Sequence, residues 1–169
     1  MLKIIEELSP FFEDCYRRIN VREYSKLMGI SPPTASKVLD SYYSESLLLK
    51  EKFRNYLMFY ANKDSEQFTD LSRTYWSIKL KELVDIMEKN ITAPAIVLFG
   101  SLSKAEAKAD SDIDLAVFAY KKEFKTELFE KKLKRKIEIF WFTSLKDIKN
   151  KELANNIING YVLKGHLQL

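Results

Sequence analysis

The strongest constraint on the fold is a short stretch in the second half of the chain. An apolar run, Ala95–Phe99, leads into Gly100-Ser101, and a polar loop then ends at the sequence Asp112-Ile-Asp114. Successive side chains of a strand point to opposite faces, so Asp112 and Asp114 share one face of the strand that begins there. The stretch therefore predicts two strands joined by a loop, with two carboxylates at the start of the second strand.

The chemistry of this stretch is that of a phosphate site with a metal ion. Two neighbouring carboxylates repel each other and raise each other's pKa unless a cation lies between them. Mg²⁺ and Mn²⁺ take oxygen ligands of this kind and often bind substrate phosphates as well. Gly100 allows a close approach of the backbone, and Ser101 adds an amide and a hydroxyl group. Asp110 has the same parity as the other two aspartates, but we expect it to cap the loop.

The order of strand, Gly-Ser, loop and Asp-x-Asp resembles the signature of the nucleotidyltransferase superfamily related to DNA polymerase beta. The resemblance is greatest to the minimal nucleotidyltransferase branch and covers roughly residue 93 to the C-terminus. In that branch arginine and glycine often follow Gly-Ser, where this chain has Leu102, Lys104 and Ala105. The resemblance implies a domain with a mixed sheet, a divalent metal ion and an NTP as substrate.

By this resemblance Asp112 and Asp114 are metal ligands and catalytic residues, and a third carboxylate comes from the neighbouring strand. Glu138 is the acidic residue that fits, because it lies within a strand predicted over 136–142, where a charge on a buried face needs a partner. The family usually has aspartate there. The expected contacts of the triphosphate are Gly100, Ser101 and Lys104.

The first part of the chain predicts several short helices and a β-hairpin. Ser9-Pro10 begins a helix expected to extend to Ile19, with its apolar residues at helical spacing. Asn20, with Glu23 three residues later, begins a second helix that stops at Gly29. A third helix starts after the next Ser-Pro, and strands follow over 47–53 and 56–61.

This order resembles a winged helix-turn-helix domain, which would occupy residues 1–64. Such domains place their second helix in the DNA major groove and contact the backbone with the hairpin, or wing. The expected nucleic-acid contacts are Thr34, Ser36, Lys37 and Arg54, with Lys50 and Lys52 as further phosphate contacts. The alternative is a module for protein contacts or dimerisation, because the exposed middle of the helix carries Lys37 but also Asp40.

A long helix is expected to connect the two domains, over residues 65–91, because apolar residues keep helical spacing there without glycine or proline. The second domain, 92–169, then alternates strands and helices, so that the chain as a whole has an α+β or α/β fold. Its expected elements are strands over 95–99, 113–119 and 136–142, a helix over 121–134, one or two helices over 144–159, and an extended turn over 160–165.

The composition of the 169 residues, 46% hydrophobic and 31% charged, is that of an ordinary globular protein. The net charge of +4 is too small to indicate nucleic-acid binding by itself. Cys15 is the only cysteine, so no internal disulfide can form, as is usual in a reducing compartment. Acidic residues interrupt the N-terminal apolar segment, and no apolar run is long enough for a membrane span. We therefore expect a cytoplasmic protein without a membrane partner.

The first functional hypothesis is a Mg²⁺- or Mn²⁺-dependent nucleotidyltransferase. It would move a nucleoside monophosphate, AMP from ATP, to a hydroxyl group of a protein or RNA acceptor, and the N-terminal domain would bind DNA, RNA or a partner such as a toxin. The alternative is a non-catalytic DNA-binding transcriptional regulator, or an antitoxin-like protein, with a nucleotidyltransferase-like domain. A third class, the modification of small molecules of the aminoglycoside type, would need a substrate domain that is not obvious in the chain.

Overall fold

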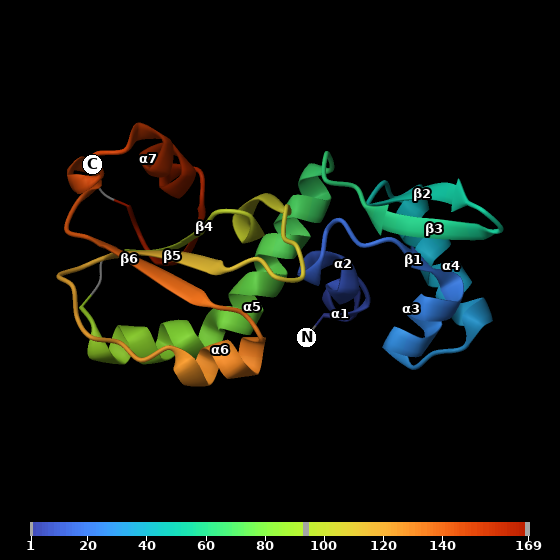
Figure 1. Ribbon diagram of the computed structural model, residues 1–169, viewed down its shortest axis with the longest axis horizontal. Helices are drawn as coiled ribbons and strands as arrows, with labels where there is room; N and C mark the ends of the chain where they lie inside the picture. Colours follow the sequence, from blue (N-terminus) through green and yellow to red (C-terminus); the bar gives the residue numbers. More distant parts are fainter. Residues whose placement is uncertain (1, 93–94, 168–169) are drawn as a thin grey trace. The chain divides into compact units, whose positions relative to one another are not determined.

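The computed structural model describes residues 2–92 and 95–167, and it divides the chain into two compact units (Figure 1). The N-terminal unit contains the chain up to Ser72 together with the segment Ala105–Ala109. The C-terminal unit contains Arg73–Lys104 and the chain from Asp110 onward. A five-residue piece of the loop that follows Gly-Ser is thus part of the N-terminal unit.

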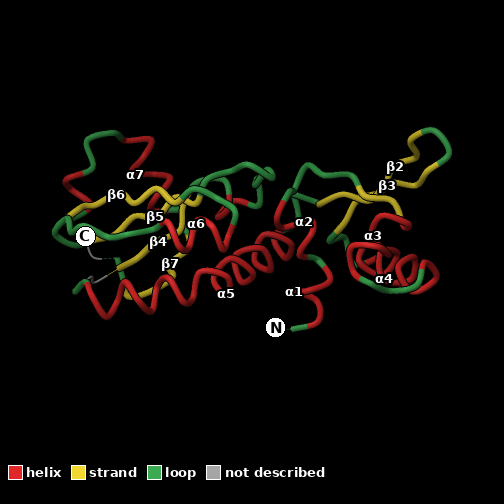
Figure 2. The backbone as a smooth tube through the Cα atoms, turned by 60° about the horizontal axis from the view of Figure 1, so that its bottom comes forward, coloured by secondary structure: helices red, strands yellow, loops and turns green. Residues whose placement is uncertain are grey.

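The N-terminal unit contains short helices and a small antiparallel sheet, which Figure 2 distinguishes by colour. Its elements are α1 (Lys3–Glu7), α2 (Ser9–Glu13), β1 (Ile19–Asn20), α3 (Val21–Met28), α4 (Pro32–Ser44), β2 (Leu48–Phe53) and β3 (Tyr56–Ala61). The strand order is β1-β3-β2, and β2 and β3 form the expected hairpin. Whether this unit acts as a winged helix-turn-helix domain stays a prediction.

The capping signals in the sequence set the bounds of the two central helices. The Asn20 side chain accepts hydrogen bonds from the amides of Arg22 and Glu23, and the Glu23 side chain accepts one from the Asn20 amide. Gly29 ends α3 in the left-handed conformation with φ 65°, which glycine adopts without a steric cost. Ser31 caps α4 through the Thr34 amide. These predicted helix ends are confirmed.

The helix expected over residues 9–19 is wrong beyond Glu13. The backbone is already extended at Asp14, and the Cys15 amide donates a hydrogen bond to the Ala107 carbonyl at 2.8 Å. Ile19 then pairs with Phe59 as part of β1. The apolar side chains that suggested helical spacing are buried all the same, because a short strand and a turn bring them to the core of this unit.

Helix α5 (Glu66–Asn90) confirms the long helix expected over 65–91, and its residues are divided between the two units at Ser72. No helix in the described parts of the chain is long and apolar enough to cross a membrane.

The C-terminal unit is built on a mixed, four-stranded sheet in the order β6-β5-β4-β7. Strands β5 and β6 are parallel, whereas β4 is antiparallel to both of its neighbours, so the expected mixed sheet is confirmed. The elements after α5 are β4 (Ala95–Phe99), η1 (Leu102–Lys104), β5 (Ile113–Phe118), α6 (Glu127–Leu133), β6 (Ile137–Phe142), η2 (Leu145–Asp147), α7 (Lys151–Ile158) and β7 (Tyr161–Gly165).

Two expected elements of this unit differ from the structure. The helix expected over 121–134 begins only at Glu127, since residues 121–126 contain a single apolar side chain, Phe124, and could not bury a helical stripe. The extended turn expected over 160–165 is the strand β7, which pairs with β4. All five residues of β4 are buried, and a buried strand needs hydrogen-bond partners on both of its edges.

One face of this sheet carries the apolar residues of alternate positions, including Val97, Phe99 and Phe118, and packs against Ile157 of α7. Figure 1 shows α7 on one side of the sheet and α5 with α6 on the other. Asp114 and Glu138 have the same parity as Phe118 and Phe140, so both acids lie on the α7 side, at the end where β4 runs out.

Candidate functional site

Strand register brings two of the expected carboxylates together. Asp114 is the second residue of β5, and its register partner on the parallel strand β6 is Glu138. Residues that face each other on neighbouring strands point to the same side of the sheet, so the two carboxylates are neighbours. Glu138 is exposed, because β6 is an edge strand and Glu138 is only its second residue. The expectation that it lies on a buried face in the middle of the strand is therefore wrong.

Gly100 lies directly against the Asp114 carboxylate. Phe99, the last residue of β4, is the antiparallel register partner of Asp114, and Gly100 follows with φ 71°. A Cβ atom at position 100 would be 2.2 Å from Asp114 Oδ2, which is far inside the contact distance. The absence of a side chain at position 100 thus lets the backbone pass this carboxylate, and the expected approach of a triphosphate to Gly100 stays a prediction.

The electrostatics of the site are those of crowded negative charge. Burial, followed by the negative charges of Glu138 and Asp112, raises the pKa of the Asp114 carboxyl group to about 6. Asp112 is half-buried just ahead of β5. A cation bound here would relieve this repulsion, so the chemistry of the three carboxylates fits a divalent metal ion.

The side chains as they stand do not yet surround such an ion. Within residues 2–92 and 95–167, no three His, Cys, Asp or Glu side chains form a group that could hold a metal. Glu138 is exposed and therefore has room to change rotamer, whereas Asp114 is held between the Gly-Ser turn and β6. The donor set fits the ion in charge and chemistry, and binding requires a rearrangement of side chains.

Asp112 is held from both sides by the segment that leads into β6. The Arg135 Nη1 atom donates a hydrogen bond to the Ser111 carbonyl at 2.5 Å, and the Ile113 amide donates one to the Lys136 carbonyl at 2.9 Å. Arg135 is only 6% exposed, and its guanidinium lies over the Trp76 ring at 5.1 Å. The backbone on either side of Asp112 is therefore tied to the start of β6.

A second arginine holds the beginning of the same loop. Arg73 Nε donates to the Ser103 carbonyl at 2.8 Å, and the fully buried Ser103 hydroxyl donates to the Gly100 carbonyl at 2.9 Å. The sequence did not single out Arg73 or Arg135. The one available signal was that Arg135 is the only arginine in the lysine-rich run 131–136.

The expected phosphate contacts lie on one short segment. Ser101 is half-buried next to Gly100, and Lys104 is exposed at the end of η1. Lys104 Nζ donates a hydrogen bond to Asn156 Oδ1 of α7 at 2.8 Å. Asp110 is exposed and lies outside the pair formed by Asp114 and Glu138.

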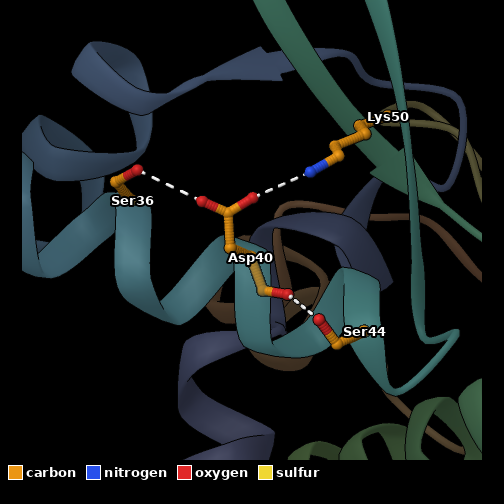
Figure 3. A network of polar contacts seen from close by, with 4 residues as sticks. All are labelled: Ser36, Asp40, Ser44 and Lys50. Atoms are coloured by element: carbon orange, nitrogen blue, oxygen red, sulfur yellow. Dashed lines mark hydrogen bonds and ion pairs between the residues drawn. The ribbon is translucent and has the colours of Figure 1, made fainter.

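The candidate contacts for nucleic acid in the N-terminal unit differ in their surroundings. The Thr34 hydroxyl is 2.9 Å from the Ser31 hydroxyl at the start of α4. Asp40 accepts hydrogen bonds from Ser36 at 3.3 Å and from Lys50 at 3.0 Å, and Figure 3 shows how these side chains lie. Thr34, Ser36 and Lys50 are thus engaged within the unit, and Lys37 and Arg54 are exposed, Lys37 on α4 and Arg54 at the turn of the hairpin.

Comparison with known proteins identifies the C-terminal part of the chain. The family model described as Polymerase beta, Nucleotidyltransferase matches residues 81–166, just over half of the chain. The match includes the whole four-stranded sheet, the Gly-Ser turn and the three carboxylates of the site. No curated protein and no solved structure has significant similarity to the chain.

Proposed function

The chain belongs to the polymerase beta nucleotidyltransferase family, and from this premise we propose that it transfers a nucleoside monophosphate from an NTP to an acceptor hydroxyl group. The observation that carries the proposal is the juxtaposition of Gly100, Asp114 and Glu138. It combines a backbone turn suited to phosphates with carboxylates whose mutual repulsion favours a divalent cation.

In this proposal Asp112, Asp114 and Glu138 would hold Mg²⁺ or Mn²⁺. The bound ions would neutralise the charge that develops on the transferred phosphoryl group. The protein's own contribution is to fix the position of these carboxylates, through the strand register and through Arg135. With the backbone of these strands fixed, only side-chain rotamers need to change when the ion and the substrate bind.

The triphosphate would lie along the Gly-Ser turn. Gly100 allows the phosphates to approach the backbone, and the Ser101 hydroxyl would donate a hydrogen bond to a β- or γ-phosphate oxygen. Lys104, now bonded to Asn156, would exchange that neutral partner for a phosphate, since a charge-assisted hydrogen bond is about twice as strong as a neutral one.

The acceptor would be large, a protein or the end of an RNA chain. The exposure of Glu138 on an edge strand supports this proposal, because a carboxylate there would be accessible to a large acceptor. The nucleotide would be AMP from ATP. Residues 1–64 would form a winged helix that binds nucleic acid or a partner protein such as a toxin, residues 65–91 a helical connector, and residues 92–169 the nucleotidyltransferase domain.

The test is the transfer of label from each of the four NTPs, labelled at the α-phosphate, to components of a cell extract in the presence of Mg²⁺. We expect transfer from ATP that is lost in the Asp112→Ala/Asp114→Ala variant. Asp110→Ala is the matched control, because Asp110 is an exposed carboxylate of the same segment. Transfer that persists in the double variant would refute the site.

A second candidate function is a non-catalytic regulator that binds DNA and uses the C-terminal unit to sense a nucleotide or hold a partner. It is favoured by the finding that, in the described ranges, the acidic side chains do not already form a metal-binding group. Isothermal calorimetry separates the two functions. Binding of Mg²⁺ and ATP that depends on Asp114 supports the enzyme, and the absence of any such binding supports the regulator.

A further inference from the structure

The outward face of the β2–β3 hairpin carries an exposed row of aromatic rings. The inward positions, such as Leu48, Phe59 and Ala61, are buried in the core of the N-terminal unit. Their neighbours along each strand must point the other way. The residues of this outward face, called here the ribbon face, are Leu49, Glu51, Phe53, Tyr56, Met58 and Tyr60.

The ribbon face is most exposed at the turn. Phe53 and Tyr56 are cross-strand register partners on either side of Arg54-Asn55, and they are 57% and 49% exposed. From Tyr56 the aromatic row continues to Tyr60, a distance of about 13 Å along an extended strand. Large exposed rings are costly to leave in water, so a cluster of them indicates a binding surface.

Arginines lie at both ends of this row. The Arg54 Cζ atom is 5.5 Å from the centre of the Phe53 ring, and the Arg18 Cζ atom is 5.0 Å from the centre of the Tyr60 ring. Glu51 is the one acid among the ribbon-face residues named above, and Arg18 forms an ion pair with it. Lys52 is exposed beside the turn, but its register with Leu57 places its side chain on the opposite face of the hairpin. Because Glu51 is paired with Arg18, the positive charge that the ribbon face offers to a ligand is that of Arg54, next to the exposed rings at the turn.

Helix α4 is less suited to binding a nucleic acid than the ribbon face is. The side chains expected to read bases from this helix are engaged internally: Thr34 lies against the Ser31 hydroxyl. Ser36 donates a hydrogen bond to Asp40 (Figure 3). Asp40 also forms an ion pair with Lys50, so the positive charge of this lysine is neutralised beside the helix. Duplex DNA needs hydrogen-bonding side chains in the major groove and an excess of positive charge, and neither is prominent here.

We propose that the ribbon face binds the unpaired nucleotides of a single-stranded nucleic acid. The bases would stack on Phe53 and Tyr56, and a phosphate would contact Arg54. Aromatic rings flanked by cations are the usual platform for single strands, because every base offers a stacking face and a duplex keeps its bases out of reach. This inference rests on that part of the proposed function that assigns nucleic-acid binding to the N-terminal unit.

The test is fluorescence anisotropy with a short labelled oligonucleotide, offered as single-stranded RNA, as single-stranded DNA of the same sequence, and as duplex DNA, at low and high salt. We expect the single strands to bind more tightly than the duplex. The Phe53→Ala/Tyr56→Ala variant should weaken single-strand binding by about tenfold or more, since stacking is worth about 1–3 kcal/mol per base. Whichever of RNA and DNA binds more tightly identifies the type of strand.

Matched variants make the result specific. Tyr120→Ala removes an aromatic ring that is 83% exposed in the C-terminal unit, and it should leave the affinity unchanged. Arg54→Gln should weaken binding and reduce its dependence on salt, because one phosphate contact is lost. Both hairpin side chains are exposed, so the double variant should unfold at the same temperature as the natural protein, which a thermal melt checks.

Three outcomes would overturn the inference: duplex bound more tightly than single strands, equal affinity of the Phe53→Ala/Tyr56→Ala variant, or no binding of any of the three nucleic acids. The Asp112→Ala/Asp114→Ala variant separates this test from that of nucleotide transfer. It should bind the single strand like the natural protein, because no NTP is present in the assay. A protein that transfers no nucleotide yet binds single strands through the ribbon face would refute the proposed enzyme and support the inference.

Discussion

The Asp114 carboxylate occupies the space that a side chain at position 100 would need, since a Cβ atom on Gly100 would lie 2.2 Å from Asp114 Oδ2. We expect Gly100→Ala to displace this carboxylate and to abolish nucleotide transfer. It should also destabilise the protein by about 1–3 kcal/mol, because φ at this position is 71°. Transfer assays and urea unfolding measure the two effects.

Gly29→Ala is the matched control for this prediction. Gly29 has a similar φ of 65°, but a Cβ atom there would meet no atom within 4 Å. The Gly29→Ala control should lower the free energy of unfolding through backbone strain and should retain transfer activity. Equal activity of the Gly100→Ala protein and the Gly29→Ala protein would show that the contact with Asp114 has no part in catalysis.

The raised pKa of Asp114 predicts how the stability of the metal-free protein depends on pH. Because the pKa is about 6 in the folded protein and about 3.9 in an unfolded chain, the folded state binds the proton more tightly. The resulting stabilisation is complete below about pH 4 and is lost as the pH rises through about 6. We expect Asp114→Asn to remove this loss, so that in EDTA the variant melts at a higher temperature than the natural protein near neutral pH.

Glu138 should be one of the charges that hold this pKa high. We expect Glu138→Gln to lower the pKa of Asp114, because one of its two like-charged neighbours is removed. Carboxyl ¹³C shifts, followed by NMR through a pH titration without metal, give this pKa directly. An unchanged Asp114 pKa in Glu138→Gln would contradict the neighbour relationship of the two carboxylates.

Divalent metal should stabilise the protein through the same carboxylates. We expect Mg²⁺ or Mn²⁺ to raise the melting temperature of the natural protein, because a ligand that binds only the folded state stabilises it. The Asp112→Ala/Asp114→Ala variant should show no such rise, and the exposed-site variant Asp110→Ala should respond like the natural protein. A rise of equal size in the double variant would place the metal elsewhere.

Arg135 should act on the site by positioning Asp112. We expect Arg135→Lys to retain the fold but to weaken the hydrogen bond to the Ser111 carbonyl, since lysine lacks the planar guanidinium. The Mg²⁺ concentration needed for half-maximal transfer should rise, while the KM for ATP changes less. Lys136→Ala is the control, because the Lys136 side chain is exposed and only its backbone carbonyl bonds to Ile113. A purely structural role of Arg135 would leave the Mg²⁺ dependence unchanged.

Local signals in the sequence predict the parts of the fold that local interactions determine. The caps at Asn20, Gly29 and Ser31 gave the bounds of α3 and α4, and continuous helical spacing gave α5. The errors fall where distant segments decide the local conformation. Cys15 bonds to Ala107, and β7 is a strand because β4 has an edge to be paired.

The residues of the site likewise include some that the local sequence predicts and others whose position depends on distant segments. That Asp112 and Asp114 lie near the Gly-Ser turn was predictable, since their spacing is local to two adjoining strands, whereas Glu138 lies on a further strand and its exposure was not predicted. The positions of Arg73 and Arg135 were not predictable. Each donates a hydrogen bond to a loop carbonyl, but a sequence does not distinguish such an arginine from the solvated lysines and arginines near it. Burial is a property of the folded chain, and it separates these arginines from the exposed lysines nearby.

The assignment of Ala105–Ala109 to the N-terminal unit limits how this protein could be divided or recombined. A polypeptide cut after Ser72 would leave the fully buried Ala105 and Ala107 on the fragment that lacks the rest of their unit. Two apolar methyl groups would then face water within the very loop that joins the phosphate turn to the acidic strand. An exchange of the first 72 residues for an unrelated module would therefore require a new sequence in this loop.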